Sequence, residues 1–145
     1  MTTDLDRGDW IRGITIRQPW ATCILAGKRT ENRPMNWPWR GWILIHAGKR
    51  MDRPALHDSL VATAIRGRHL HQGAVIGIAR LTDCHPDLGP ERCTSPWAQR
   101  DTHHLVLDDV HELPLPVPAR GALPAWRPTQ DLVDRVLQQL PDLQL

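Results

Sequence analysis

Three charged side chains of opposite sign follow Gly27 at short intervals. Lys28, Glu31 and Arg33 are separated by three and then two residues. If the chain is extended after Gly27, residues 31 and 33 project from the same face of a strand, with Lys28 at its beginning. Such a group can bind an anion, or it can hold a water or hydroxyl group between a base and two cations. An ordinary ion pair that closes a loop uses the same residue types, so that interpretation stays open.

The choice of lysine at position 28 is itself informative. The chain has only two lysines, Lys28 and Lys49, and its other basic residues are arginines. An ammonium group is compact and can lose its proton when it is desolvated, whereas a guanidinium group keeps its charge. The sequence therefore marks Lys28 as a candidate catalytic group, acting together with Glu31.

Tryptophan supplies every aromatic ring of the chain, because the sequence has seven Trp and no Phe or Tyr. Proteins that hold single-stranded nucleic acid combine a cationic groove for the phosphates with aromatic faces for the bases. Trp20, Trp37 or Trp39 is a candidate stacking platform, and burial in the core is the alternative for each. The candidate cations of the groove are Arg17, Lys28, Arg29, Arg33, Arg40 and Lys49.

The charge distribution favours the same ligands. The chain has a net charge of +2, but residues 1–53 carry +5 and residues 54–145 carry −3. Clustered positive charge attracts anions, and phosphates above all. A solvated basic face would have the same composition, so charge alone does not decide between the two.

The histidines and cysteines give weaker signals. His46 ends an apolar segment and is a candidate general base for a 2′-hydroxyl, although a hydrogen-bonded structural histidine would also fit there. Two groups of potential metal ligands lack the short paired spacing of zinc sites. We therefore expect no metal and no cofactor from these two groups, which are His103, His104 and His111, and Cys84, His85 and Cys93.

A length of 145 residues fits one domain. Hydrophobic periodicity and turn residues predict strands at 12–17, 42–47, 73–81 and 103–110, an extended proline-rich segment at 113–118, and helices at 19–26, 54–66 and 128–140. Few strand–helix–strand units recur, so the pattern favours an α+β domain with a small, mostly antiparallel β-barrel flanked by about three helices.

The same composition bears on location and assembly. No apolar run reaches the roughly 20 residues of a membrane-spanning helix, and the polar N-terminus lacks the apolar segment of a signal peptide. Three cysteines without paired spacing favour reduced thiols. We therefore expect a cytoplasmic monomer without a membrane partner, whose residues 1–11 form a flexible tail.

Several motifs in order resemble the ASCH domains of the PUA-like superfamily, whose signature is G-x-K-x-x-E-x-R. Lys28, Glu31 and Arg33 match its last three fixed positions, while Ala26 stands at the glycine position unless Gly27 is the counterpart. The resemblance continues through IRQPWA at 16–21, IHAGK at 45–49, GAVIG at 73–77, PVPARGAL at 116–123 and WR at 126–127.

This resemblance implies a PUA-like barrel that binds RNA, another single-stranded nucleic acid or a modified nucleoside in a basic cleft. Two kinds of enzyme share the fold: a metal-independent ribonuclease and an amidohydrolase of N4-acylated cytidines, in which the motif lysine acts with a threonine and a glutamate. Glu31 stands here where that threonine would be. A protein-interaction module is a third alternative. The candidate ligand-binding residues are Arg17, Gln18, Trp20, Lys28, Arg29, Glu31, Asn32, Arg33, Trp37, Trp39 and Lys49.

Overall fold

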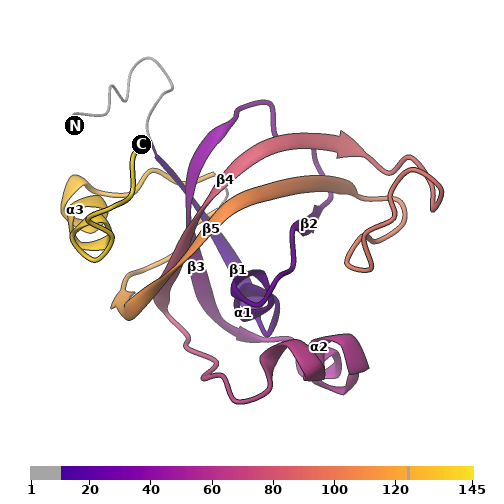
Figure 1. The fold of residues 1–145 in the computed structure, drawn as a ribbon, viewed down its shortest axis with the longest axis horizontal. Coiled ribbons are helices and arrows are strands. Elements are labelled where there is room, and N and C mark those ends of the chain that lie inside the picture. The colour runs from indigo at the N-terminus through magenta and orange to yellow at the C-terminus, as the bar shows by residue number, and fades with distance from the viewer. Residues whose placement is uncertain (1–10, 124) are drawn as a thin grey trace.

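A computed structural model of the chain describes residues 11–123 and 125–145 (Figure 1). Within these ranges the chain forms five strands, three α-helices and one 3-10 helix. In order these are β1 (Arg12–Gln18), α1 (Trp20–Leu25), β2 (Thr30–Arg33), β3 (Gly41–Met51), the 3-10 helix η2 (Pro54–His57), α2 (Ser59–Ile65), β4 (Ala74–Pro86), β5 (His103–Pro118) and α3 (Gln130–Gln138).

The strands form one mixed sheet in the order β1-β3-β4-β5-β2. β1 pairs in parallel with β3, and the other three pairings are antiparallel. The expected α+β class is confirmed. The sheet is not closed by backbone pairing between its edge strands β1 and β2, so the expected barrel is not confirmed.

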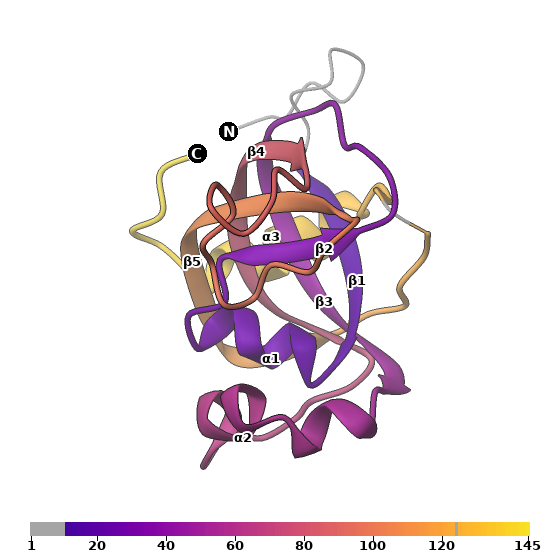
Figure 2. The same ribbon diagram turned by 90° about the vertical axis from the view of Figure 1, so that its right-hand side faces the viewer.

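The sheet is strongly curved, and its two edges approach each other (Figure 2). At this point a side chain joins them, because Arg33 of β2 donates a hydrogen bond from Nη2 to the backbone oxygen of Thr15 in β1, at 3.1 Å. Helix α1 lies inside the curve, and α3 packs against the outside (Figure 1). The candidate motif is therefore located where the open edges meet.

Two hydrophobic clusters fill the two faces of the sheet. Ile43 and Ile45 of β3 point to the concave cluster, which α1 completes with Ile24. Leu44 of the same strand points to the other cluster, where Val136 of α3 packs. Because both faces of β3 are covered, its sequence is continuously apolar and does not alternate.

Three details differ from the sequence-based predictions. The expected helix at 54–66 is divided into η2 and α2, because Asp58 adopts an extended conformation and caps α2 through hydrogen bonds to the amides of Leu60 and Val61. Strands β3, β4 and β5 are longer than predicted. The proline-rich segment 113–118 is the end of β5. It pairs with β4 on one side only, because β2 pairs with residues 103–106 of β5.

The expected tail falls almost wholly on residues 1–10, which lie outside the described ranges. Ile11 does not belong to a tail, since it is only 4% exposed and packs in the cluster with Leu44. No helix in the described residues is long and apolar enough to cross a membrane.

Candidate functional site

The turn after α1 sets the position of the charged motif. Gly27 has a φ of +119°, a conformation that side-chain-bearing residues rarely adopt, whereas Ala26 has a φ of −95°. The backbone amide of Lys28 then donates to the oxygen of Cys23, at 2.9 Å. Gly27 is thus the residue whose backbone conformation requires glycine, and the turn that it forms leads from α1 through Lys28 into β2.

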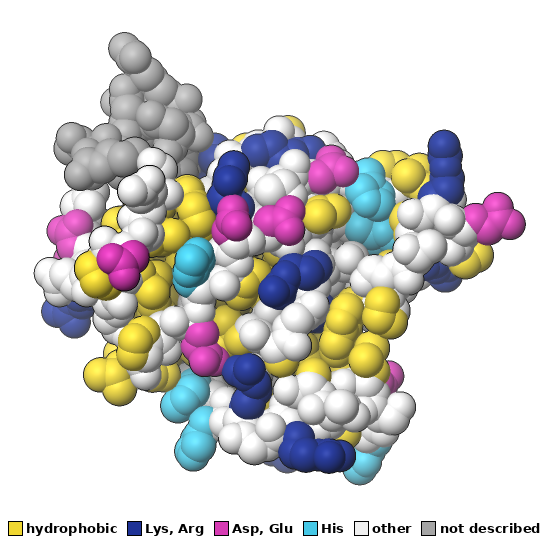
Figure 3. Space-filling model, viewed as in Figure 1, with side chains coloured by type: hydrophobic (Ala, Val, Ile, Leu, Met, Phe, Trp, Pro, Cys, Tyr) yellow, Lys and Arg dark blue, Asp and Glu magenta, His cyan; other side chains and the backbone are white. Residues whose placement is uncertain are grey.

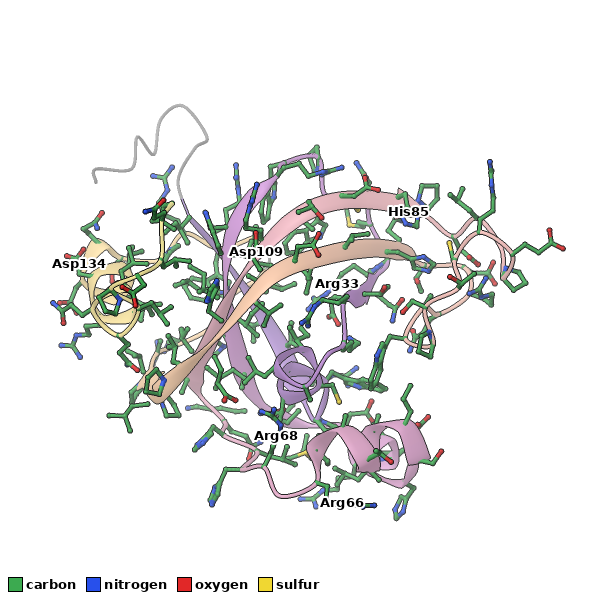
Figure 4. All side chains as sticks on the ribbon, viewed as in Figure 1. Arg33, Arg66, Arg68, His85, Asp109 and Asp134 are labelled. Carbon is green, nitrogen blue, oxygen red and sulfur yellow. The ribbon has the colours of Figure 1, made fainter. Side chains whose placement is uncertain are left out.

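The three charged side chains converge, as their spacing predicts. Lys28 Nζ lies 2.5 Å from Glu31 Oε1, and Arg33 Nη2 lies 3.0 Å from Glu31 Oε2. Lys28 is 1% exposed and Glu31 6%, so this is a buried ion cluster and not a surface pair. Figure 4 shows Arg33 between the sheet and α1, inside the curve.

Electrostatics keep Glu31 ionised. Burial alone would raise the pKa of Glu31, but the positive charges of Lys28 and Arg33 and their hydrogen bonds outweigh it, so that the pKa of Glu31 lies below its ordinary value. Each carboxylate oxygen accepts one hydrogen bond from the cluster and has a second lone pair for another donor. Lys28 likewise has three donors, of which Glu31 takes one.

A pocket of about 310 Å³ opens on this cluster. This is the lower end of the size range for small-molecule ligand pockets. Its walls come from β1, α1, β2 and the loop between β4 and β5. The lining residues are Thr15, Ile16, Arg17, Trp20, Lys28, Glu31, Asn32, Arg33, Pro34, Asp52 and Gln99.

Trp20 borders the pocket as predicted, and a carboxylate holds its ring. The indole Nε1 donates to Asp52 Oδ2 at 2.9 Å, and Lys28 Nζ lies 5.3 Å from the centre of the ring, in cation–π contact. Sequence reasoning missed Asp52, which follows β3 and comes near α1 only because β3 pairs with β1. The sequence offered no signal for it, because the predicted strand ended at residue 47 while β3 runs to Met51.

The long loop at 87–102 forms another wall that the sequence did not predict. Asn32 donates to the backbone oxygen of Trp97 and accepts from the backbone amide of Gln99, at 2.8 and 3.0 Å. Asn32 therefore fastens this loop to the pocket beside Glu31. The sequence marked Asn32 as a neighbour of the motif glutamate. It did not predict the partners of Asn32, which are 65 and 67 residues away in the chain.

A second hollow of about 340 Å³ adjoins the pocket and shares Thr15 and Arg17 with it. Its cations are Arg17, Lys49, Arg50 and Arg120, all of them exposed. Within the described ranges no carboxylate forms an ion pair with any of the four. By contrast, basic and acidic side chains are interspersed on the face shown in Figure 3. Other exposed arginines form ion pairs, Arg80 with Asp109 and Arg68 with Glu112.

His46 lines this second hollow and not the pocket with Lys28. It is 2% exposed, and its Nε2 lies 2.7 Å from the backbone oxygen of Ala119. Its Nδ1 is buried and has no hydrogen-bond partner in the part of the chain that the structure describes. Burial lowers the pKa of His46 more than the hydrogen bond to Ala119 raises it. The structure thus separates His46 from Lys28 and Glu31, the two groups with which it was grouped as catalytic.

Four other candidates have different surroundings. Gln18 is fully buried; it accepts from the amide of Thr22 and donates to the oxygen of His71, and so fixes the start of α1. Arg29 donates to the oxygen of Ile24 and does not line the pocket. Trp37 is 7% exposed and packs in the core, which was the stated alternative to a stacking role, although it also lines a hollow beside Trp39. Trp39 lines a third hollow, which shares Arg33 and Pro34 with the pocket, and the guanidinium of Arg12 lies over its ring.

No protein-family model and no curated protein sequence matches this chain. The site must therefore be interpreted from its own geometry and chemistry.

One group of side chains outside the pocket has the composition of a metal site. His85, Cys93 and His104 each offer one ligand atom, and these three atoms lie within 4.8 Å of one another. The group takes members from both sequence groups considered above, which is why spacing within either group did not reveal it.

Proposed function

We propose that the protein binds single-stranded RNA, or a modified nucleotide, with one base in the pocket and the neighbouring phosphates on the basic hollow. The observation that carries this proposal is the continuity of the two sites through Thr15 and Arg17. A single base fits the volume of the pocket, and an extended strand would continue onto the cations beside it.

The pocket offers the groups that recognise a base edge. Lys28 and Arg33 supply donors, and Glu31 supplies free lone pairs. Unstacked bases are commonly held by hydrogen bonds to their edges together with an aromatic face, which Trp20 supplies here. This combination favours a single-stranded ligand, because the base edges of an A-form duplex are paired within its grooves.

The basic hollow offers what a phosphate backbone needs. Arg17, Lys49, Arg50 and Arg120 are exposed and have no ion-pair partner among residues 11–123 and 125–145. When such cations bind phosphates, counterions are released from the nucleic acid, so the affinity of the site falls steeply as the salt concentration rises.

The resemblance to the ASCH domains belongs to this proposal. The residues that carry the signature, Lys28, Glu31 and Arg33, line one pocket, as a binding motif requires. We propose that the curved sheet corresponds to a PUA-like barrel in which the Arg33–Thr15 hydrogen bond links the edges that backbone pairing leaves open. We also propose that the protein acts as a monomer in the cytoplasm.

Substitution of Trp20 tests the pocket. In Trp20→Ala, loss of the stacking face is expected to weaken binding of a labelled single-stranded RNA by about 1–3 kcal/mol, measured by fluorescence anisotropy. Trp42→Ala is the matched control, since Trp42 packs against the cluster on the other face of the sheet and does not line the pocket, so this variant should keep the wild-type affinity. Circular dichroism of both variants checks their fold. Equal affinities of the wild type and Trp20→Ala would overturn the proposed pocket.

A hydrolase of N4-acylated cytidines is the second candidate, favoured by the 2.5 Å contact between Lys28 and Glu31 in a pocket of nucleoside size. Glu31 would activate water as general base and Lys28 would stabilise the developing oxyanion. Incubation with N4-acetylcytidine should then release acetate, and Glu31→Gln should abolish the release. Absence of acetate with the wild type would exclude this activity. Incubation of a labelled RNA with the protein and a chelator tests the metal-independent ribonuclease, and an uncleaved RNA would argue against that activity.

A further inference from the structure

The end of the β4–β5 hairpin holds three metal-ligand side chains with a favourable mutual arrangement. His85 of β4 and His104 of β5 face each other as a cross-strand pair, with ring centres 5.3 Å apart. Cys93 comes from the loop that joins the two strands, and all three ligand atoms lie within 4.8 Å. Figure 4 shows His85 where β4 enters this loop, away from α3 and its Asp134.

Backbone carbonyls orient both imidazoles toward the role of metal ligand. His85 Nδ1 lies 2.8 Å from the oxygen of Pro86, and His104 Nε2 lies 2.7 Å from the oxygen of Gln99. A carbonyl oxygen only accepts, so each of these nitrogens carries the proton. The second nitrogen of each ring, Nε2 of His85 and Nδ1 of His104, then keeps the lone pair with which an imidazole binds a metal. Metal-bound histidines almost always donate their second N–H in this way.

The surroundings hold the third ligand in place. The amide of Cys93 donates to the oxygen of Gly89, and Cys93 Sγ accepts from the amide of Leu88 at 3.3 Å. Arg100 donates to the oxygen of Cys93 and also pairs with Asp87, whose carboxylate accepts from the amides of Gly89 and Asp101. Cys93 is 7% exposed and His104 1%, so two of the three ligands are withdrawn from solvent.

We propose that His85, Cys93 and His104 bind a zinc-class ion, which fastens the 87–102 loop to the end of the sheet. One thiolate and two imidazoles are the donor set that a borderline-soft divalent ion prefers. In a tetrahedral zinc site the ligand atoms are about 3.5 Å apart, so side-chain shifts of about 1 Å close this group around the ion. On binding, the Cys93 S–H bond breaks, a Zn–S bond forms, and one proton passes to solvent. A water molecule takes the fourth coordination position.

The ion would not line the proposed nucleotide pocket, but it would stabilise the loop that forms one wall of that pocket. Gln99 lines the pocket, its backbone oxygen receives the His104 hydrogen bond, and its amide binds Asn32 beside Glu31. A metal that fixes His104 therefore stabilises the position of Gln99. The metal site itself does not depend on whether the pocket binds RNA.

Cobalt(II) titration of the full-length protein tests the site, because tetrahedral cobalt absorbs visibly and a thiolate adds a charge-transfer band. We expect one cobalt per chain, displacement by zinc, and release of one proton per ion. Cys93→Ser should abolish the charge-transfer band, and His85→Gln should weaken zinc binding at least about ten-fold. His85 is only partly buried, so His85→Gln is expected to fold even if the substitution of the buried His104 prevents folding.

Cys84→Ser and His103→Gln are the matched controls, since each neighbours the group in sequence without belonging to it. Both should keep wild-type cobalt spectra and zinc affinity. The proposal is overturned if the wild type gives no tetrahedral cobalt spectrum, or if Cys93→Ser and His85→Gln bind as tightly as the two controls.

Discussion

At the scale of single residues, Glu31 is the centre of the site. It is buried, it is ionised, and it is bonded to Lys28 on one oxygen and to Arg33 on the other. Two buried or half-buried cations depend on this one carboxylate, and removal of one partner from a buried ion pair leaves the remaining charges uncompensated. The same residue therefore supports both the proposed binding and the fold around it.

Glu31→Gln is expected to lower the free energy of unfolding by about 3–5 kcal/mol, because Lys28 and Arg33 lose their buried counter-charge. Glu112→Gln is the control, since Glu112 forms an exposed ion pair with Arg68 whose loss should cost about 1 kcal/mol or less. Urea denaturation of both variants measures the difference. Similar losses in the two variants would show that the cluster contributes no more than a surface pair.

His46 gives a second prediction at this scale, through pH. Its folded-state pKa is lowered, so between the ordinary value of about 6.5 and that lower value the unfolded chain binds more protons than the folded one. Stability contributed by neutral His46 is therefore present above about pH 6.5 and is lost as the pH falls through this window. His46→Gln should flatten the pH dependence of unfolding, while His57→Gln, an exposed control, should not. Equal slopes in all three proteins would contradict this account.

At the scale of elements, short connections bring the motif together. Helix α1 has six residues and ends at a glycine turn, so that β2 begins within five residues of the helix and carries Glu31 and Arg33 on one face. Local pattern was enough to predict this arrangement. It was not enough for the walls supplied by Asp52 and Gln99, because these depend on the β1–β3 and β2–β5 pairings and on the course of a long loop.

The same contrast explains one prediction that was wrong and one alternative that the sequence left open. A helical pattern at 54–66 concealed the break at Asp58, whose side chain competes for the amides of the next turn. The sequence also could not distinguish Trp20 from Trp37, since both follow or precede prolines in the same basic region. Burial decided between them, and burial is set by tertiary packing.

Gly27→Ala tests the turn. Among the described residues no atom outside its chain neighbours lies within 4 Å of the position its Cβ would occupy, so the cost is conformational. We expect a loss of about 1–2 kcal/mol in the free energy of unfolding. Weaker RNA binding should accompany it, since Lys28 is the next residue. Ala26→Gly, one position earlier, should cost at most about 1 kcal/mol. If Gly27→Ala is as stable as the wild type, the turn does not require glycine.

At the scale of the whole molecule, the decisive feature is an uneven charge distribution on a nearly neutral chain. The net charge is only +2, yet four exposed cations without ion-pair partners in the described ranges gather beside the pocket. Over β4 and β5 basic side chains pair with acidic ones, as Arg80 does with Asp109. Exposed arginines without an ion-pair partner in those ranges also occur elsewhere, such as Arg66 at the end of α2, but Arg66 lines neither hollow. Binding should therefore depend on this one region and not on the overall charge.

The most direct test is a salt series of single-stranded RNA binding with wild type, Arg17→Gln and Arg66→Gln. Arg17 lines both hollows, whereas Arg66 is an exposed arginine at the end of α2 and lines neither. We expect the wild type and Arg66→Gln to share one affinity that falls steeply with salt, and Arg17→Gln to bind more weakly with a slope that is smaller by about 0.7. Absence of binding at low salt, or equal curves for Arg17→Gln and Arg66→Gln, would contradict the proposed nucleic-acid site.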